Sequence, residues 1–309
     1  MRILDSAAQL ETLSGEWREL WDSDPLASVF QGPDWLIPWT RHLWGGGKLR
    51  VATMRRAGRL IGVAPMFIWG SRRLAWLGAG ISDYLGITAA PEFADEAAGN
   101  VFTALEEMRG EWERCDLEEL REDSPMLRAA AVADVQVCSV CPARRADQPL
   151  PPRLVKNLRY AERKLGAFEF GPCEWDDLFR LHELRWGGEG VLRSRAVREF
   201  HRTAAGDSTR LYGIRVSGQL IAAQYNLVTK GRACYYLGGY DPAWSACSPG
   251  GVLLRHAMEE GLKEGARIFD FLRNPEPYKY AWGARDQINR RISLTTSDHA
   301  ALAGSIRAW

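Results

Sequence analysis

The second half of the chain repeats the first. Setting Gly58 over Gly218, an offset of 160 residues, aligns further identical residues without a gap. These pairs are Leu60-Ile61 with Leu220-Ile221, Arg72 with Arg232, and Leu77-Gly78 with Leu237-Gly238. Each half also gives the same order of expected elements: strand, turn, strand, strand, helix, strand. Because a repeated order of elements indicates a repeated supersecondary unit, we expect two copies of one α/β unit.

The 309 residues are enough for two domains of ordinary size. Pro149 to Pro152 (PLPP) is the best linker candidate, so we expect domains at 1–148 and 149–309. Helices are expected at 6–21, at 30–44 after an initial turn, at 95–108, from 124, and at 153–166, 174–186, 194–206 and 249–264. Strands are expected at 50–56, 59–69, 73–78, 115–120, 134–140, 210–216, 219–228, 233–239 and 267–272. This mixture predicts an α/β fold with a mixed (α+β) sheet in each half.

Composition excludes several classes of function. Forty basic and thirty-nine acidic residues leave a net charge of +1, so the chain has no global field that would attract DNA. The N-terminus has no apolar stretch of signal-peptide length, and no later stretch is apolar enough to span a membrane. Six scattered cysteines also fit a cytoplasmic protein. Cys138 and Cys141 form a C-x-x-C within a strand pattern, without a second pair, so we expect no metal site.

The stretch Arg267 to Gly283 concentrates polar and aromatic groups in one short segment. Its first six residues are typical of a buried strand with a lone acid, Asp270. Two X-Pro pairs end the strand, and Pro277 can begin a helix on which Tyr278 and Trp282 share a face. Because open α/β sheets bind ligands where a strand ends in a loop, this is a candidate site. The alternative is an ordinary connection with a satisfied acid.

Three stretches of the second half carry a family resemblance: LHELRWGGEG (181–190), YYLGGYDPAWSACSPGGVLL (235–254) and DFLRNPEPYKYAW (270–282). They resemble the GNAT acyltransferase superfamily. More narrowly, they are similar to its CelD-like branch, whose domain is related to Fem-type peptidyl transferases. FQGPDWLIPW and SDYLGI in the first half resemble the same branch. The resemblance implies two tandem GNAT-like domains. Asn274-Pro275 departs from it, because the branch usually has a glycine there.

The donor side of such an enzyme is expected in the second half. A thioester donor needs a phosphate cradle, and Ser248-Pro249-Gly250-Gly251 can begin a helix whose amides favour an anion. The alternative is a capped packing helix, because the Gln/Arg-x-x-Gly-x-Gly/Ala loop typical of GNAT enzymes is missing. The fold implies oxyanion donors from the main chain of the preceding strand, and Gly238-Gly239 would allow a close approach there. The expected donor-binding residues are Tyr236, Leu237, Gly238, Gly239, Ser248, Gly250 and Gly251.

For the catalytic groups, the resemblance implies Tyr278, Lys279 and Asp270. A tyrosine hydroxyl could protonate the departing thiolate, or it could be a structural hydrogen-bonding group. Neither Cys234 nor Cys247 has a histidine nearby in sequence, which disfavours covalent catalysis.

The acceptor side is expected to involve both halves. His182, Arg185 and Trp186 share one helix face, and Arg185 could bind a carboxylate or phosphate, or brace Asp270, which we favour slightly. The full set of expected substrate-binding residues is Trp35, Trp39, Asp83, Tyr84, His182, Arg185, Trp186, Arg273, Glu276 and Trp282. Arg153, Lys156, Arg159 and Arg163 form a basic stripe along one helix, which could hold a phosphorylated ligand or be only a solvated face.

These features together predict an N-acyltransferase. The donor would be acetyl-CoA or another acyl-CoA, and the acceptor would be an amine. The resemblance to CelD-like proteins suggests that this amine belongs to a cell-envelope sugar. The first half lacks the Tyr-Lys motif and would shape the acceptor side. One alternative is an aminoacyl-tRNA donor, as in Fem-type proteins, but the charge is not strongly positive and no coiled-coil arm is visible. Another is a non-catalytic binding protein with the same fold.

Overall fold

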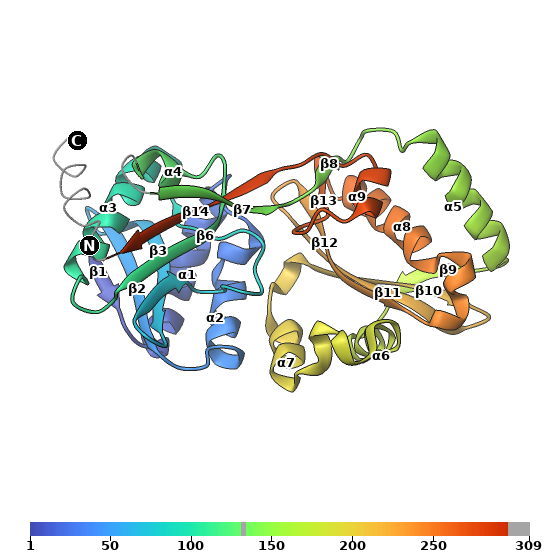
Figure 1. Cartoon of the computed structure of the whole chain (residues 1–309), viewed down its shortest axis with the longest axis horizontal. Coiled ribbons are helices and arrows are strands. Elements are labelled where there is room, and N and C mark those ends of the chain that lie inside the picture. The colour runs from blue at the N-terminus through green and yellow to red at the C-terminus, as the bar shows by residue number, and fades with distance from the viewer. Residues whose placement is uncertain (131–133, 296–309) are drawn as a thin grey trace. The chain divides into compact units, whose positions relative to one another are not determined.

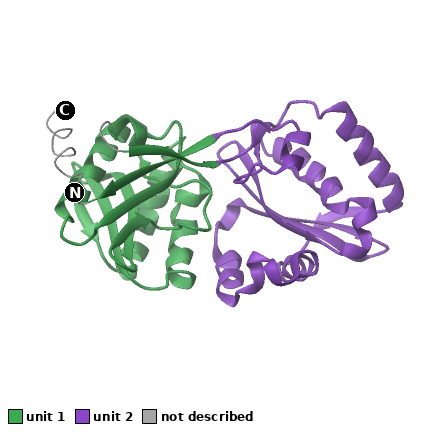
Figure 2. Ribbon diagram, viewed as in Figure 1, with its two compact units in different colours: residues 1–139, 288–309 green, residues 140–287 purple. Residues whose placement is uncertain are grey.

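The computed structural model describes residues 1–130 and 134–295. It divides the chain into two compact units, residues 1–139 with 288–309 and residues 140–287 (Figure 2). Each unit contains one mixed sheet with helices packed against it (Figure 1). The fold class expected from the sequence, a mixed α/β chain with two units in tandem, is therefore the fold observed.

The first unit is built on a sheet with the order β1-β2-β3-β4-β6-β14-β7, to which β5 adds beside β3. Its strands are β1 (Arg2–Leu4), β2 (Lys48–Arg56), β3 (Arg59–Trp69), β4 (Arg73–Trp76), β5 (Thr88–Ala89), β6 (Arg114–Arg121), β7 (Asp134–Val140) and β14 (Ile288–Thr295). Its helices are α1 (Ala7–Ser23), α2 (Pro33–His42), α3 (Ala94–Glu107) and α4 (Pro125–Ala129). The strands β2, β3 and β4 form antiparallel pairs, and β6 then joins β4 in parallel.

The second unit has the sheet order β8-β13-β12-β11-β10-β9. Its strands are β8 (Ala143–Arg145), β9 (Glu169–Pro172), β10 (Thr209–Val216), β11 (Gln219–Thr229), β12 (Arg232–Tyr240) and β13 (Ile268–Asp270). Its helices are α5 (Pro152–Leu165), α6 (Trp175–Trp186), α7 (Arg195–Thr203), α8 (Pro249–Lys263) and α9 (Pro277–Ala281). Helices α5 and α8 cover one face of the sheet, and α6 and α7 cover the other (Figure 1).

The two sheets share one topology. In each, an antiparallel meander ends in a strand that receives a parallel neighbour after a helix: β4 and β6 around α3, β12 and β13 around α8. A further antiparallel strand follows in both, β14 on β6 and β8 on β13. In the first unit that strand comes from the far end of the described chain.

This exchange of strands moves the unit boundaries away from the expected 1–148 and 149–309. Strand β14 belongs to the first unit because its Ile292 and Leu294 are buried in that unit's hydrophobic core. Strand β8 precedes Pro149 but pairs with β13 of the second unit. The Arg144 side chain also donates to the Gln148 and Pro149 carbonyls, which fixes the expected linker to the second unit. Residues after 295 of the expected second domain lie outside the described residues.

The helix α8 packs closely on its sheet because of a small residue. A Cβ added to Gly261 would lie 2.8 Å from the Cβ of Ala233 on β12, which is closer than side-chain carbons approach. The apolar residues of α8, including Val252, Leu253 and Met258, join Phe269 in the core. Helix α8 therefore lies in a fixed position against the strands that it connects.

Candidate active site

The second sheet opens beside β12. Strand β12 pairs with β13 over Arg232–Cys234, whereas its pairing with β11 continues to Tyr240. Within the described residues, the stretch 235–240 therefore has no strand paired along its β13 side. Strands that separate in this way leave backbone N–H groups available to a ligand. The sequence predicted such an opening at Tyr236 to Gly239, and the strand pairing agrees with it.

Asp270 holds the turn that opens the sheet. Its carboxylate is fully buried and accepts a hydrogen bond from the Leu272 amide at 2.8 Å and another from the Arg232 guanidinium at 2.5 Å. Leu272 has a left-handed backbone with φ of 59°, so the chain turns away from β12 directly after Asp270. This burial and these hydrogen bonds favour a structural role for Asp270, and its expected catalytic role stays a prediction. Arg232, rather than Arg185, braces Asp270.

Lys279 fastens the loop that follows. Its Nζ donates to the carbonyl oxygens of Leu272 at 3.1 Å, Arg273 at 2.5 Å and Asn274 at 2.8 Å, and lies 2.7 Å from Oε2 of Glu276. The side chain is buried, which favours a structural role for Lys279 as well, and its expected catalytic role stays a prediction. Asn274 occupies the position where the family usually has glycine, and its φ of 78° is one that asparagine tolerates better than most residues.

Tyr278 is the catalytic candidate that stays accessible. It is 41% exposed, and its ring makes an edge contact with Phe271, with centroids 6.3 Å apart. Partial burial, and then the neighbouring Tyr235 and Glu276, raise the pKa of the Tyr278 hydroxyl well above its ordinary value. The hydroxyl therefore remains protonated at neutral pH and can donate a proton or a hydrogen bond.

Tyr235 is a residue that the sequence reasoning missed. Burial, and then Glu276, raise the pKa of Tyr235 to about 12, while Arg185 opposes the rise. Tyr235 therefore lies within electrostatic range of Glu276, Tyr278 and Arg185, at the start of the opened part of β12. The signal available in the sequence was its place directly before Tyr236 and the glycine pair.

The two glycines of β12 have a packing role. A Cβ added to Gly239 would lie 2.2 Å from the backbone nitrogen of His182, so α6 contacts the strand backbone there. The Trp186 indole N–H donates to the Gly238 carbonyl at 3.4 Å. Gly239 is thus required for helix packing, in addition to any role in ligand approach. The Tyr236 ring packs against His201 and Tyr225, which leaves only its main chain for an oxyanion.

Arg185 lies between two aromatic rings at the end of α6. Its guanidinium carbon is 4.8 Å from the ring centroids of both Trp186 and Tyr240. In the described part of the chain it forms no ion pair, so its N–H donors can bind a carboxylate or phosphate. His182, one turn earlier on α6, is buried. Burial, and then Arg198, lower the pKa of His182 to about 4, so this imidazole is neutral.

The start of α8 differs from the expected cap. Ser248 is the N-cap residue of α8, as expected, but its backbone is left-handed with φ of 46° and its side chain makes no capping hydrogen bond. The Gly251 amide donates to the Ser248 carbonyl at 3.0 Å and is thus already used. Among the described residues, the Gly250 amide has no such partner. Gly250 also lies near Tyr240, whose ring contacts Arg185.

Several expected acceptor residues are core residues instead. Trp35 is fully buried, and its indole N–H donates to Ser82 at 2.9 Å. Tyr84, Asp83 and Trp282 are also buried. This burial favours structural roles for all four side chains, and their expected part in substrate binding stays a prediction. Residue type alone does not determine burial.

Arg273, Glu276 and Trp39 are placed differently. The Arg273 carbonyl and the Glu276 carboxylate both bind Lys279, so these residues help to hold the loop. Trp39 lines a hollow in the first unit.

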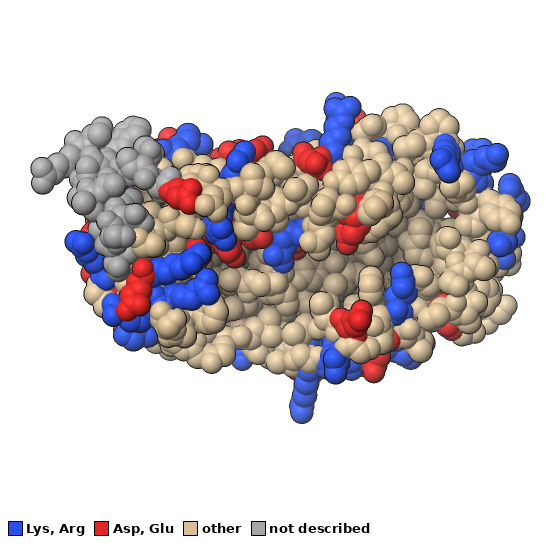
Figure 3. Space-filling model, viewed as in Figure 1, with Lys and Arg blue, Asp and Glu red and all other residues tan. Residues whose placement is uncertain are grey.

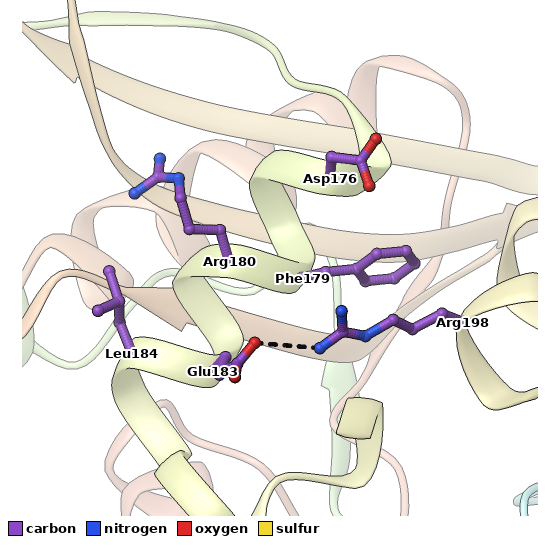
Figure 4. A pocket seen from close by; sticks show the side chains of 6 residues that line it. All are labelled: Asp176, Phe179, Arg180, Glu183, Leu184 and Arg198. Atoms are coloured by element: carbon purple, nitrogen blue, oxygen red, sulfur yellow. Dashed lines mark hydrogen bonds and ion pairs between the residues drawn. The ribbon is translucent and has the colours of Figure 1, made fainter. Parts of the chain in front are cut away.

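A hollow of about 340 Å³ lies beside α6, lined by Phe179, Glu183 and Arg198 among others (Figure 4). Arg198 points toward Glu183 and pairs with it at 3.1 Å. The guanidinium carbons of Arg198 and Arg202 lie 5.4 Å and 5.0 Å from the Phe179 ring centroid. These charges satisfy one another, so this surface is a poor candidate for the site.

Comparison with known proteins assigns the second unit to a family. Residues 152–280 match the model of the acetyltransferase (GNAT) domain. No curated protein matches the sequence.

Solved structures share the fold over nearly the full chain. FemX has 12% identity and a TM-score of 0.68, covering 94% of this chain and 97% of its own. The C-terminal domain of a putative lysylphosphatidylglycerol synthetase from Agrobacterium fabrum has 14% identity and a TM-score of 0.63, covering 98% and 97%. A tandem GNAT protein from the clavulanic acid biosynthesis pathway has 14% identity and a TM-score of 0.55, covering 96% and 98%.

The chain therefore carries a GNAT acetyltransferase domain and is an acyltransferase. Within the described residues, no helix is long and apolar enough to cross a membrane. No group of histidine, cysteine or acidic side chains among those residues could hold a metal ion.

Proposed function

We propose that the second unit transfers an acyl group from acyl-CoA to an amine by direct attack. The observation that carries this proposal is the opened edge of β12 with the accessible, protonated Tyr278 near it. In such a site the thioester carbonyl oxygen accepts hydrogen bonds from main-chain amides of Tyr236 to Gly239. These donors are fixed before the reaction, so they stabilise the oxyanion without reorganisation.

The chemical step balances with the groups available. The amine lone pair forms the new C–N bond, the C–S bond breaks, and its electron pair leaves on the thiolate. The Tyr278 hydroxyl gives its proton to the thiolate, the amine loses a proton to solvent, and the tyrosinate regains a proton from solvent before the next turnover. No covalent enzyme intermediate is required. Cys234 on β12 is a buried cysteine.

We further propose that the donor phosphates bind at the start of α8. The Gly250 amide begins a helix, where an anion is favoured. Arg185, held by Trp186 and Tyr240, would supply the guanidinium that the sequence lacks in the loop before α8. In this proposal the second unit binds the donor, in a cytoplasmic enzyme.

The direct test is a transfer assay with acetyl-CoA and a panel of amines, following release of free thiol. Thiol release that depends on the amine, with acylated amine found by mass spectrometry, would support the proposal. An acyl-CoA that binds without any turnover would instead favour a non-catalytic binding protein.

A second candidate donor, an aminoacyl-tRNA, is favoured by one observation. Arg153, Lys156, Arg159 and Arg163 are exposed on α5, and within the described residues none of them pairs with an acid. In Figure 3 basic side chains gather over α5, with little acidic surface between them. This row is about 15 Å long at the rise of an α-helix.

Salt dependence separates the two donors. A nucleic acid held by four such contacts should lose affinity with a log–log slope of about −3 or steeper. Because we propose acyl-CoA as the donor, we expect tRNA to bind weakly. We also expect the double variant Arg159→Ala with Arg163→Ala to leave that weak tRNA binding unchanged. A steep slope that this double variant reduces would favour the tRNA donor.

A further inference from the structure

The first unit contains a hollow that lies outside the proposed donor site, and Trp39, one of the expected acceptor residues, lines it. Its volume is about 530 Å³, within the range of about 300–1,000 Å³ typical of small-ligand sites. The walls come from the end of α2, the glycine loop after it, the ends of β3 and β4, and β6. Since all of these elements belong to one compact unit, the shape of the hollow is fixed by that unit alone.

Small residues keep this hollow open. A Cβ built on Gly45, Gly46, Gly70 or Gly80 would meet no atom within 4 Å, so these positions border open space. Gly47 is different: its φ is 104°, and a Cβ there would lie 2.3 Å from the Ile68 carbonyl oxygen. The glycine loop is therefore pressed against the end of β3, and its surface beside the hollow consists of backbone.

Aromatic side chains form the apolar part of the lining. Trp39 and Phe67 are nearly buried and pack edge to face, with ring centroids 5.2 Å apart. Trp69, on the same strand as Phe67, is 44% exposed. Because Trp69 lines a concave site together with two further aromatic rings, its exposed ring surface is available to a ligand. A flat aromatic surface of this kind suits a ring with an apolar face.

The polar part of the lining is rigid. Arg73 lies directly across from Trp69 in the β3–β4 ladder, and its guanidinium carbon is 5.5 Å from the Trp69 ring centroid. The same guanidinium pairs with Asp116 at 3.2 Å. Asp116, whose side chain is only 9% exposed, is also bonded to Arg114 at 2.7 Å and Ser293 at 2.9 Å. A guanidinium and carboxylate are thus fixed beside an exposed indole before any ligand binds.

The charges beside the hollow balance. Glu118 is the second acid in the lining, and it lies 3.5 Å from Arg291. Both lining acids thus have basic partners, so the hollow offers hydrogen-bonding groups without a strong net charge. This arrangement disfavours a phosphate or a simple cation. It favours an uncharged ring that has an apolar face and several hydroxyl groups around its edge.

We propose that this hollow is a saccharide-binding site, with one sugar ring stacked on Trp69 and its hydroxyls bonded by Arg73 and Glu118. The proposal does not rest on acyl transfer, because binding is measured without an acyl donor. Whether the bound sugar is also the acceptor is a separate question for the transfer assay.

The test uses the full chain with two probes, cellobiose and N,N′-diacetylchitobiose, in saturation-transfer NMR and calorimetry. At least one probe should bind, with its ring C–H protons receiving most saturation. Trp69→Ala should weaken binding about tenfold or more, while Trp69→Phe, which keeps an aromatic face, should retain most of it. Circular dichroism and melting curves establish that each variant is folded.

A matched pair of arginines sharpens the test. Arg73→Ala should also weaken binding about tenfold. Arg56→Ala is the control: Arg56 likewise lies over a ring, Phe93, and pairs with an acid, Glu96, but it is outside the hollow. The proposal is overturned if neither probe binds at about 10 mM, or if folded Trp69→Ala binds as well as wild type. It is also overturned if adenosine binds at Trp69 in place of both sugars.

Discussion

Arg232 and Asp270 pair at 2.5 Å at the last point where β12 and β13 run side by side. Asp270 is fully buried, whereas 17% of the Arg232 side chain is exposed, and the other Asp270 oxygen accepts from the Leu272 amide. The Asp270 carboxylate thus lies where the parallel pairing of β12 and β13 ends, and it stabilises the turn after which the two strands separate. The opening on which the proposed reaction depends is therefore set by a buried ion pair.

Replacing Asp270 by Ala should strongly destabilise the second unit. The change leaves the Arg232 charge buried without its carboxylate, and breaking such pairs costs about 3–5 kcal/mol in the free energy of unfolding. Denaturant unfolding measures it. Asp147→Ala is the control, because the Arg145–Asp147 pair is exposed to solvent and should contribute little to the free energy of unfolding. Equal losses in the two variants would contradict the structural role of Asp270.

Lys279→Met should loosen the loop 272–276 while the sheet stays folded. The variant keeps the apolar stem but leaves the three carbonyls of Leu272, Arg273 and Asn274 without their donor. Each lost partner of a buried polar group costs about 1–3 kcal/mol, so the loop should exchange its amide hydrogens much faster. Lys263→Met, on exposed α8 surface, should leave this exchange unchanged. Unaltered loop protection in Lys279→Met would count against the interpretation.

Tyr278→Phe should lower turnover by about 10²–10⁴ with little change in donor affinity, as expected for a positioned acid. The raised pKa also predicts a pH profile. The ordinary pKa of a tyrosine hydroxyl is about 10, and the pKa of Tyr278 is raised above it, so this hydroxyl keeps its proton up to at least about pH 10. Turnover should therefore not fall between about pH 8 and 10 through loss of this proton.

Tyr280→Phe is the matched control, since Tyr280 lies on the same short helix and bonds Asp286 at 2.7 Å. It should keep most of the turnover. A fully active Tyr278→Phe enzyme would return Tyr278 to a structural role.

Stability should decline as the pH falls from about 6.5 toward 4. Burial lowers the pKa of His182 to about 4, and burial, then His182, lowers that of His201 to about 3, whereas both would titrate near 6.5 when unfolded. In this window the unfolded chain binds more protons, so each histidine removes up to about 1.4 kcal/mol per pH unit. Denaturant unfolding at several pH values measures the slope. His201→Phe should make it shallower, and an unchanged slope would contradict this account.

The sequence predicted the order of elements well, because the hydrophobic periods of the strands and helices are strong and local. It also indicated the opening of β12 through Gly238-Gly239. It did not show roles that depend on distant partners. Asp270 is satisfied by Arg232, from a neighbouring strand, and Lys279 by carbonyls that a left-handed turn brings inward.

Two other features could not be predicted for the same reason. Strand β14 pairs with β6, more than 160 residues earlier in the chain, and only the sheet register shows this. Trp35 and Tyr84 resembled groove residues by type and position, but both are in the core of the first unit. The hollow beside Trp69 was missed because its lining comes from loops and strand ends that are separate in sequence.

The central claim is that the chain has one acyl-donor site and that this site lies in the second unit. Strand β6 of the first unit corresponds to β13 of the second unit. No tyrosine or lysine follows β6 at the positions that correspond to Tyr278 and Lys279. The helix α3 begins with Asp95 and Glu96 in its first turn, and these would repel a phosphate.

Calorimetry with a non-reactive acyl-CoA analogue tests this claim most directly. The account predicts one site per chain, lost in Gly250→Asp because the new carboxylate lies at the start of α8, and retained in Trp69→Ala of the first unit. Two equivalent sites per chain, or donor binding that a folded Gly250→Asp protein keeps unchanged, would contradict it.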